Sequence, residues 1–150
     1  MDWTIGQQFE REIASFGDAV ALLGHEFFPH PLPTGELLLW IYWQPLSPTE
    51  HSLKSFVHVY GDVNPATGSI LWSQDDQYPQ QGRLDSKRWA AGGVYRDVYY
   101  LSTQDLADGE YQISVGWYEP ASGARIPLTD GTDTFDIDSL QYSAPMKAEP

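Results

Sequence analysis

Cysteine is absent from this 150-residue sequence, which excludes disulfide bonds, thiolate metal sites and a cysteine nucleophile. Basic residues are few: Lys and Arg number 8 against 21 Asp and Glu, for a formal net charge of −13. A chain this acidic repels phosphate backbones and anionic membrane surfaces, so we expect no nucleic-acid partner. The longest apolar run, residues 37–43, is too short to cross a bilayer. The start, MDWTIGQQFERE, lacks the pattern of a signal peptide, and we expect no membrane insertion by this chain.

Catalytic motifs are equally scarce. The sequence contains no G-x-S-x-G elbow, no H-E-x-x-H, no phosphate-binding loop and no G-x-G-x-x-G. The four histidines are too scattered to suggest a metal site. A hydrolase would need two carboxylates facing each other across an open cleft, and the sequence does not single out such a pair. The expectation is therefore a protein that is not an enzyme.

Short apolar stretches rich in β-branched and aromatic residues are abundant, and Gly, Pro, Asp and Ser clusters separate them. Such stretches suit the pleated surface of a sheet. They cover residues 20–28, 36–44, 55–61, 69–75, 94–101 and 111–118, with a weaker pair at 125–128 and 134–137. About eight strands with short connections predict an all-β fold, a two-sheet antiparallel β-sandwich of jelly-roll or immunoglobulin-like type.

The length predicts a single domain over residues 1–150. Its core is expected at about 16–138, after an N-terminal lead-in at 1–15 and before a flexible tail at 139–150. Within the first part of the chain, Phe9, Ile13 and Phe16 are spaced to share one face of a short helix.

Two turns and one long link organise the predicted strands. NPATGS at 64–69 and EPASGA at 119–124 both read Pro-Ala-hydroxyl-Gly, in which Pro fixes the first turn residue and Gly takes the left-handed position. Each predicts a hairpin. The link over 76–93 contains Pro79, Gly82, Gly92 and Gly93, and we expect it to cross between the sheets.

Period-two alternation places isolated polar side chains among aromatic ones. In FVHVYGD, His58 falls between Phe56 and Tyr60 on a row that looks buried, and neighbouring strands show similar mixed rows. The candidate ligand-binding residues collected from these rows and from the long link are His58, Gln74, Asp76, Asp97, Trp40, Tyr42, Trp72 and Trp89.

Two interpretations of these rows stay open. Aromatic faces accept the C–H patches of a sugar while carboxylate, amide and imidazole groups bind its hydroxyls, so the rows fit a neutral glycan. Alternatively, His58 hydrogen-bonds Asp97 or Asp76 inside the sandwich and fixes the register of the strands. Trp89 poses the same choice, either as a stacking platform in a loop or as a plug for one end of the sandwich.

Clustered aspartates raise the question of a cation. The segment TDGTDTFDID brings together Asp130, Asp133, Asp136 and Asp138, and Ca²⁺ prefers several oxygen ligands. The spacing is not that of an EF-hand, and Asp136 and Asp138 alternate with apolar residues as on the solvent face of a strand. We therefore expect no cofactor and no metal site, with Ca²⁺ as the alternative.

The order of elements resembles a β-sandwich domain found in the extracytoplasmic part of bacterial multi-pass membrane proteins of the dolichyl-phosphate-mannose-type glycosyltransferase class. The resemblance covers about residues 16–137. Its matching pieces are FGDAVALLGHEF, GELLLWIYWQPLSPTEHSLKSFVHVYGD, SQDDQYPQQG, GGVYRDVYYL and DGEYQISVGWYEPASGARIPL.

In that pattern a strand histidine, an aspartate before a Pro-Gly loop, a loop tryptophan and a later strand aspartate recur together. They correspond here to His58, Asp76, Trp89 and Asp97. The resemblance implies a non-catalytic accessory domain at the cell envelope, although this chain carries no membrane spans. Taken with the mixed rows, it leads us to expect glycan or polysaccharide binding. The alternative is a structural spacer or protein-interaction domain without a small ligand.

Overall fold

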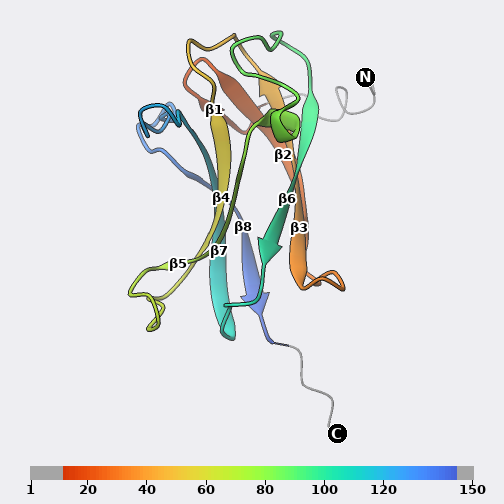
Figure 1. Ribbon diagram of the computed structural model, residues 1–150, viewed down its shortest axis with the longest axis vertical. Coiled ribbons are helices and arrows are strands. Elements are labelled where there is room, and N and C mark those ends of the chain that lie inside the picture. The colour runs from red at the N-terminus through yellow and green to blue at the C-terminus, as the bar shows by residue number, and fades with distance from the viewer. Residues whose placement is uncertain (1–11, 145–150) are drawn as a thin grey trace, which may run out of the picture.

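The structure is a computed structural model that describes residues 12–144, and it is an all-β sandwich of two antiparallel four-stranded sheets (Figure 1). The first sheet has the order β1-β2-β3-β6, with β1 Ala14–Phe16, β2 Val20–Phe28, β3 Glu36–Pro45 and β6 Tyr95–Ser102. The second has the order β5-β4-β7-β8, with β5 Leu71–Gln77, β4 Lys54–Tyr60, β7 Gly109–Tyr118 and β8 Phe135–Tyr142. The predicted two-sheet β-sandwich is confirmed.

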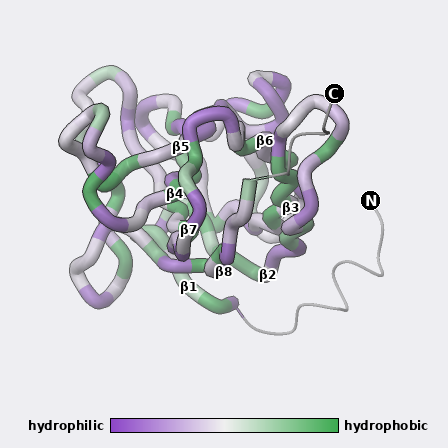
Figure 2. The backbone as a smooth tube through the Cα atoms, turned by 90° about the horizontal axis from the view of Figure 1, so that it is seen from below, coloured by the Kyte–Doolittle hydropathy of each residue, from purple (hydrophilic) through white to green (hydrophobic). Residues whose placement is uncertain are grey.

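The core lies between the two layers, which Figure 2 shows separately when the molecule is seen from below. Alternate residues of β3 and β7 point into it, and the rings of Trp43 and Trp117 meet edge-to-face at 5.0 Å in its centre. Val57 and Val59 of β4 are completely buried there. The row from Phe56 to Tyr60 that looks buried in the sequence therefore lies on the outer face of the second sheet.

Both predicted hairpins form, and they use the same hydrogen bonds. The Gly68 N–H donates to the Asn64 carbonyl at 2.7 Å, and the Gly123 N–H donates to the Glu119 carbonyl at 2.7 Å. Both glycines have positive φ, 75° and 77°, which a residue with a Cβ rarely adopts. The second hairpin returns the chain beside β7 only as an isolated bridge at Arg125, so the strand predicted over 125–128 is reduced to single bridges.

The chain ends differ from their predictions. Instead of a helix, residues 14–16 form β1, which pairs with β2 and buries Phe16, while Phe9 lies outside the described residues. At the other end β8 continues to Tyr142, so the tail predicted from residue 139 starts too early. Leu140 and Tyr142 are buried in the core, which explains why the strand continues.

The link after β5 crosses from the second sheet to the first, as predicted, although its first two residues still belong to β5. It contains one turn of 3-10 helix, η1 Pro79–Gly82, in which Gln80 and Gln81 both have positive φ. No helix within residues 12–144 has the length and apolar composition that spanning a bilayer requires. The two sheets are thus joined at this edge by the long link that contains η1.

Candidate functional site

His58 lies in the middle of β4, on the outer face of the second sheet and partly exposed. Its partners in the ladder are Gln74 of β5 and Ser114 of β7. The sequence suggested a buried row because Phe56 and Tyr60 flank it. The two valines of the same strand are the residues that face the core, since a sandwich sheet buries only one of its faces.

Phe56 is nonetheless buried, because other side chains cover it from outside. Its ring lies over Gly116 of β7, where a Cβ would come within 2.2 Å of the Phe56 Cζ. The Arg125 guanidinium lies 4.7 Å from the centroid of the Phe56 ring, and the centroid of the His58 ring lies 4.5 Å from it. Phe56 therefore forms an apolar floor on the outside of the sheet, packed against the backbone of β7.

A hollow of about 340 Å³ opens above this floor. This outer hollow is lined by Phe56, His58, Gln74, Asp76, Tyr118 and Arg125. Three of the predicted site residues, His58, Gln74 and Asp76, thus come together from two neighbouring strands.

Asp76 is the least satisfied group in the outer hollow. Its Oδ2 accepts a hydrogen bond from the Tyr118 hydroxyl at 3.1 Å, whereas its Oδ1 is buried without a hydrogen-bond partner. Buried carboxylate oxygens normally have partners, because leaving one unpaired costs the desolvation free energy of the group. Asp76 therefore has one acceptor oxygen without a partner in the wall of the outer hollow.

The His58 imidazole is biased towards its neutral form. Desolvation lowers its pKa below the usual value of 6.5; the Asp76 charge opposes this shift and the Arg125 charge adds to it. A neutral imidazole offers one N–H donor and one nitrogen acceptor. His58 forms no hydrogen bond to Asp76 or to Asp97, all three of which the structure describes, so the predicted buried pair inside the sandwich is wrong.

Asp97 lies apart from His58. It points from β6 of the first sheet into the interior, with 2% of its surface exposed, and its Oδ1 accepts the Gln80 N–H at 2.9 Å and the Gln80 amide at 3.0 Å. Desolvation raises its pKa to about 6, although the two hydrogen bonds oppose that shift. The predicted cluster is therefore divided, with Asp97 holding η1 against the sandwich edge.

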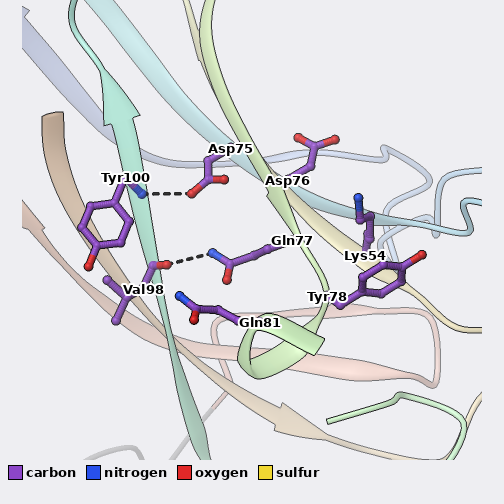
Figure 3. Close-up of a pocket in the computed structure, with 8 residues that line it drawn as sticks. All are labelled: Lys54, Asp75, Asp76, Gln77, Tyr78, Gln81, Val98 and Tyr100. Atoms are coloured by element: carbon purple, nitrogen blue, oxygen red, sulfur yellow. Dashed lines mark hydrogen bonds between the residues drawn. The ribbon is translucent and has the colours of Figure 1, made fainter. Parts of the chain in front are cut away.

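A second hollow, the edge hollow, lies where β5 meets β6, and its volume is about 350 Å³ (Figure 3). Its lining includes Lys54, Asp75, Asp76, Tyr78, Gln81 and Tyr100. Gln77 donates to the Val98 carbonyl at 2.8 Å and the Tyr100 N–H donates to Asp75 at 3.0 Å, which ties the two strands together across the gap between the sheets. Desolvation also raises the Asp75 pKa.

The predicted tryptophans do not line the outer hollow. Trp89 is the plug of the sandwich end: its indole N–H donates to the Ser47 carbonyl at 2.6 Å and its ring packs edge-on against Trp117 at 5.8 Å. It is 1% exposed, so it offers no stacking surface. Trp72, at a bulge in β5, packs on Tyr111 of the core edge rather than beside Gln74.

Trp40 and Tyr42 face outward from the other sheet. The Arg96 guanidinium lies 4.1 Å from the Trp40 ring, and Phe28 packs edge-on against the same ring at 5.0 Å. Tyr42 is buried with Ala21 and Leu23 on that outer face. Since β3 belongs to the first sheet, these two aromatics lie across the sandwich from His58.

The aspartates of the predicted cation cluster have separate partners. Asp136 accepts from the Tyr60 hydroxyl, Asp133 pairs with Arg125 at 3.3 Å, and Asp138 lies 2.8 Å from the His25 imidazole. Asp130 accepts a hydrogen bond from the Thr132 N–H, which closes the turn that contains both residues. Within residues 12–144, no group of three or more His, Asp and Glu side chains is arranged to hold a metal ion.

Tyr118 and Arg125 are the site residues that sequence reasoning missed. The EPASGA hairpin returns Arg125 to a bridge with Tyr118, which places its side chain over Phe56. The turn was recognisable, so counting the residues on either side of it would have placed these two side chains next to each other.

No protein-family model matches this sequence, and no curated protein sequence matches it. The fold and the two hollows therefore carry the functional argument on their own, and the likeness to the accessory domain of membrane glycosyltransferases stays a prediction.

Proposed function

We propose that this chain is a non-catalytic module that binds a neutral glycan in the outer hollow. The single observation that carries the proposal is Asp76, whose Oδ1 is buried without a partner in a wall that also contains Gln74 and His58. A sugar hydroxyl is a donor of the right kind for that oxygen. The resemblance adds the expectation of a place at the cell envelope.

The remaining groups of the outer hollow suit the same ligand. The Gln74 amide both donates and accepts, and a neutral His58 imidazole does the same, so neighbouring hydroxyls find either partner. Tyr118, which is partly exposed, supplies aromatic surface for the apolar face of a sugar ring, beside the buried Phe56 floor. The acidic chain, with a net charge of −13, disfavours an anionic ligand.

A structural spacer or protein-interaction domain is the second candidate. The observation that favours it is the contact between β5 and β6, where Asp75 and Gln77 form hydrogen bonds with the backbone of β6. These two hydrogen bonds hold the strands together and need no ligand. This candidate predicts that the chain binds no sugar, either as the wild type or with substitutions in the outer hollow.

A hydrolytic role has less support. Asp76 is the one carboxylate among the described residues that line the outer hollow, and Asp97, whose pKa is raised, lies inside the sandwich. The two are not arranged across an open cleft, which is the geometry that a pair of catalytic carboxylates requires. We therefore propose binding without bond cleavage.

Isothermal titration against a panel of neutral polysaccharides tests the proposal. We expect binding with a dissociation constant of about 1 mM or tighter for at least one polymer. Asp76→Ala and His58→Ala should each weaken that binding about tenfold, because each removes hydrogen bonds to the ligand. His51→Ala is the matched control, since His51 is exposed before β4 and outside the hollow.

Two results would contradict the proposal. One is the absence of any heat change with every polymer at millimolar sugar. The other is binding that His58→Ala and Asp76→Ala leave unchanged, which would place the ligand elsewhere on the surface.

A further inference from the structure

The outer hollow and the edge hollow share one wall. Asp76 lines both: its Oδ2 accepts from the Tyr118 hydroxyl of the outer hollow, and it lines the edge hollow together with Lys54 and Tyr78. Lys54 is the ladder partner of Tyr118, so a residue of each hollow lies beside the other at the start of β4. In Figure 3, Asp76, Lys54 and Tyr78 lie on one side of the β5 ribbon, and Asp75 and Gln81 lie on the side of β6.

The two hollows also repeat the same set of chemical groups. The outer hollow holds an aromatic ring, a carboxylate and a glutamine amide in Tyr118, Asp76 and Gln74. The edge hollow holds Tyr78, Asp75 and Gln81. Two similar sets of binding groups fit a polymer whose successive units carry the same hydroxyls and ring faces, such as a polysaccharide.

Each hollow has one cation resting on an aromatic ring. Arg125 lies over Phe56, and the Lys54 Nζ lies 4.9 Å from the centre of the Tyr78 ring. Each hollow also has at least one carboxylate among its lining residues, so neither hollow carries an excess of positive charge for an anionic polymer. Tyr78 is 39% exposed, which leaves ring surface available for contact with a ligand.

From these observations we propose that the two hollows form one groove with two subsites, and that the ligand is an extended chain of a neutral polysaccharide passing over Asp76. This inference rests on the proposed function and deepens it. The outer hollow binds one unit of the chain, and the edge hollow binds a unit further along against Tyr78. Binding then strengthens with chain length until both subsites are filled.

Titration with neutral oligosaccharides of increasing length tests the groove, using gluco-, manno-, galacto- and N-acetylglucosamine series from the disaccharide to the hexasaccharide. We expect the hexasaccharide of the preferred series to bind about tenfold more tightly than the disaccharide. Tyr78→Ala should abolish that gain and leave disaccharide binding unchanged. His58→Ala should weaken binding of both lengths.

Ile70→Ala serves as the control, because Ile70 is an exposed apolar residue outside both hollows. Equal affinity for short and long chains, or a Tyr78→Ala variant that keeps the gain, would overturn the groove while leaving a single glycan site intact. Stronger binding of polygalacturonate than of every neutral chain would overturn it as well. If no saccharide binds the wild-type chain, the proposed function and the groove fall together.

Discussion

The His25 imidazole lies 2.8 Å from the Asp138 carboxylate and joins the two sheets at one open edge of the sandwich. His25 belongs to β2, beyond the part of that strand that β1 covers, and Asp138 belongs to β8, the last strand of the second sheet. The opposite edge is joined by the Gln77 and Asp75 contacts to β6. Polar side chains thus connect the layers at both edges, and the apolar core lies between them.

Replacing His25 with Ala should lower the free energy of unfolding by about 0.5–1 kcal/mol, because both partners are partly exposed and their interaction is screened by water. Urea denaturation followed by Trp fluorescence measures the change. His51→Ala is the control: His51 lies 3.9 Å from Glu50 in a pair with more than half of each side chain exposed, and its loss should leave stability unchanged. Equal losses for the two variants would contradict a role for the inter-sheet pair.

Asp97 should make stability depend on pH. Its folded pKa of about 6 is higher than the 3.8 of an unperturbed aspartate, so the folded protein holds the proton more tightly than the unfolded chain. The stabilisation is complete below about pH 4 and is lost as the pH rises through about 6. At pH 7.5, the free energy of unfolding of Asp97→Asn should be about 2–3 kcal/mol higher than that of the wild type. The reason is that the amide remains neutral while its oxygen still accepts from Gln80.

Chemical denaturation of Asp97→Asn and the wild type across pH 4 to 8 measures that difference. We expect it to grow between pH 4 and pH 6 and to remain constant above that range. Asp105→Asn, a change at an exposed position, should show no such growth. A constant difference between Asp97→Asn and the wild type over the whole range would be inconsistent with a raised Asp97 pKa.

Gly116→Ala should destabilise the protein by about 1–3 kcal/mol, because the new Cβ would meet the Phe56 ring at 2.2 Å and the Asp133 carbonyl at 2.9 Å. The ring must move outward and reduce the outer hollow. Thermal unfolding and a glycan titration on the same variant measure both effects. At Gly93 a Cβ meets nothing within 4 Å, so Gly93→Ala should behave like the wild type. An unchanged melting temperature for Gly116→Ala would show that Phe56 does not rest on this glycine.

Trp89→Phe should cost about 1–3 kcal/mol of stability, since the Ser47 carbonyl loses the indole donor and a small space opens beside Trp117. Trp89→Ala should cost about 3–5 kcal/mol. Guanidinium denaturation followed by circular dichroism measures both. Trp40→Phe, a partly exposed position on the outer face of the first sheet, should cost less than Trp89→Phe. The reverse order would indicate that Trp89 is not a structural plug.

Much of the fold follows from local patterns in the sequence. Alternating apolar rows identified β2 and β3 closely, and the two Pro-Ala-hydroxyl-Gly turns located their hairpins. The helix predicted through Ile13 and Phe16 was wrong, because a short segment with few apolar residues fits either period, and pairing with β2 selected the strand. The end of β8 was missed because its buried residues, Leu140 and Tyr142, are separated by polar ones.

The candidate site was predictable in its types of residue but not in its geometry. Gln74 and Asp76 were placed correctly beside each other, since they alternate on one strand. His58 was assigned to the wrong face because both rows of β4 are apolar enough to form a core, and only the packing of the second sheet decides between them. Asp97 could not be separated from His58, because alternation within a strand does not reveal which sheet the strand joins.

The side chains that connect β5 and η1 to β6 also form hydrogen bonds with the backbone of β6, which is the edge strand of the first sheet. The Tyr100 N–H is bonded to Asp75, the Val98 carbonyl accepts from Gln77, and the Arg96 carbonyl accepts from Gln80. An edge strand with these main-chain groups already paired offers a poor template for another chain to extend the sheet. Self-association by strand addition, and the fibrous aggregation to which it leads, is therefore disfavoured along β6.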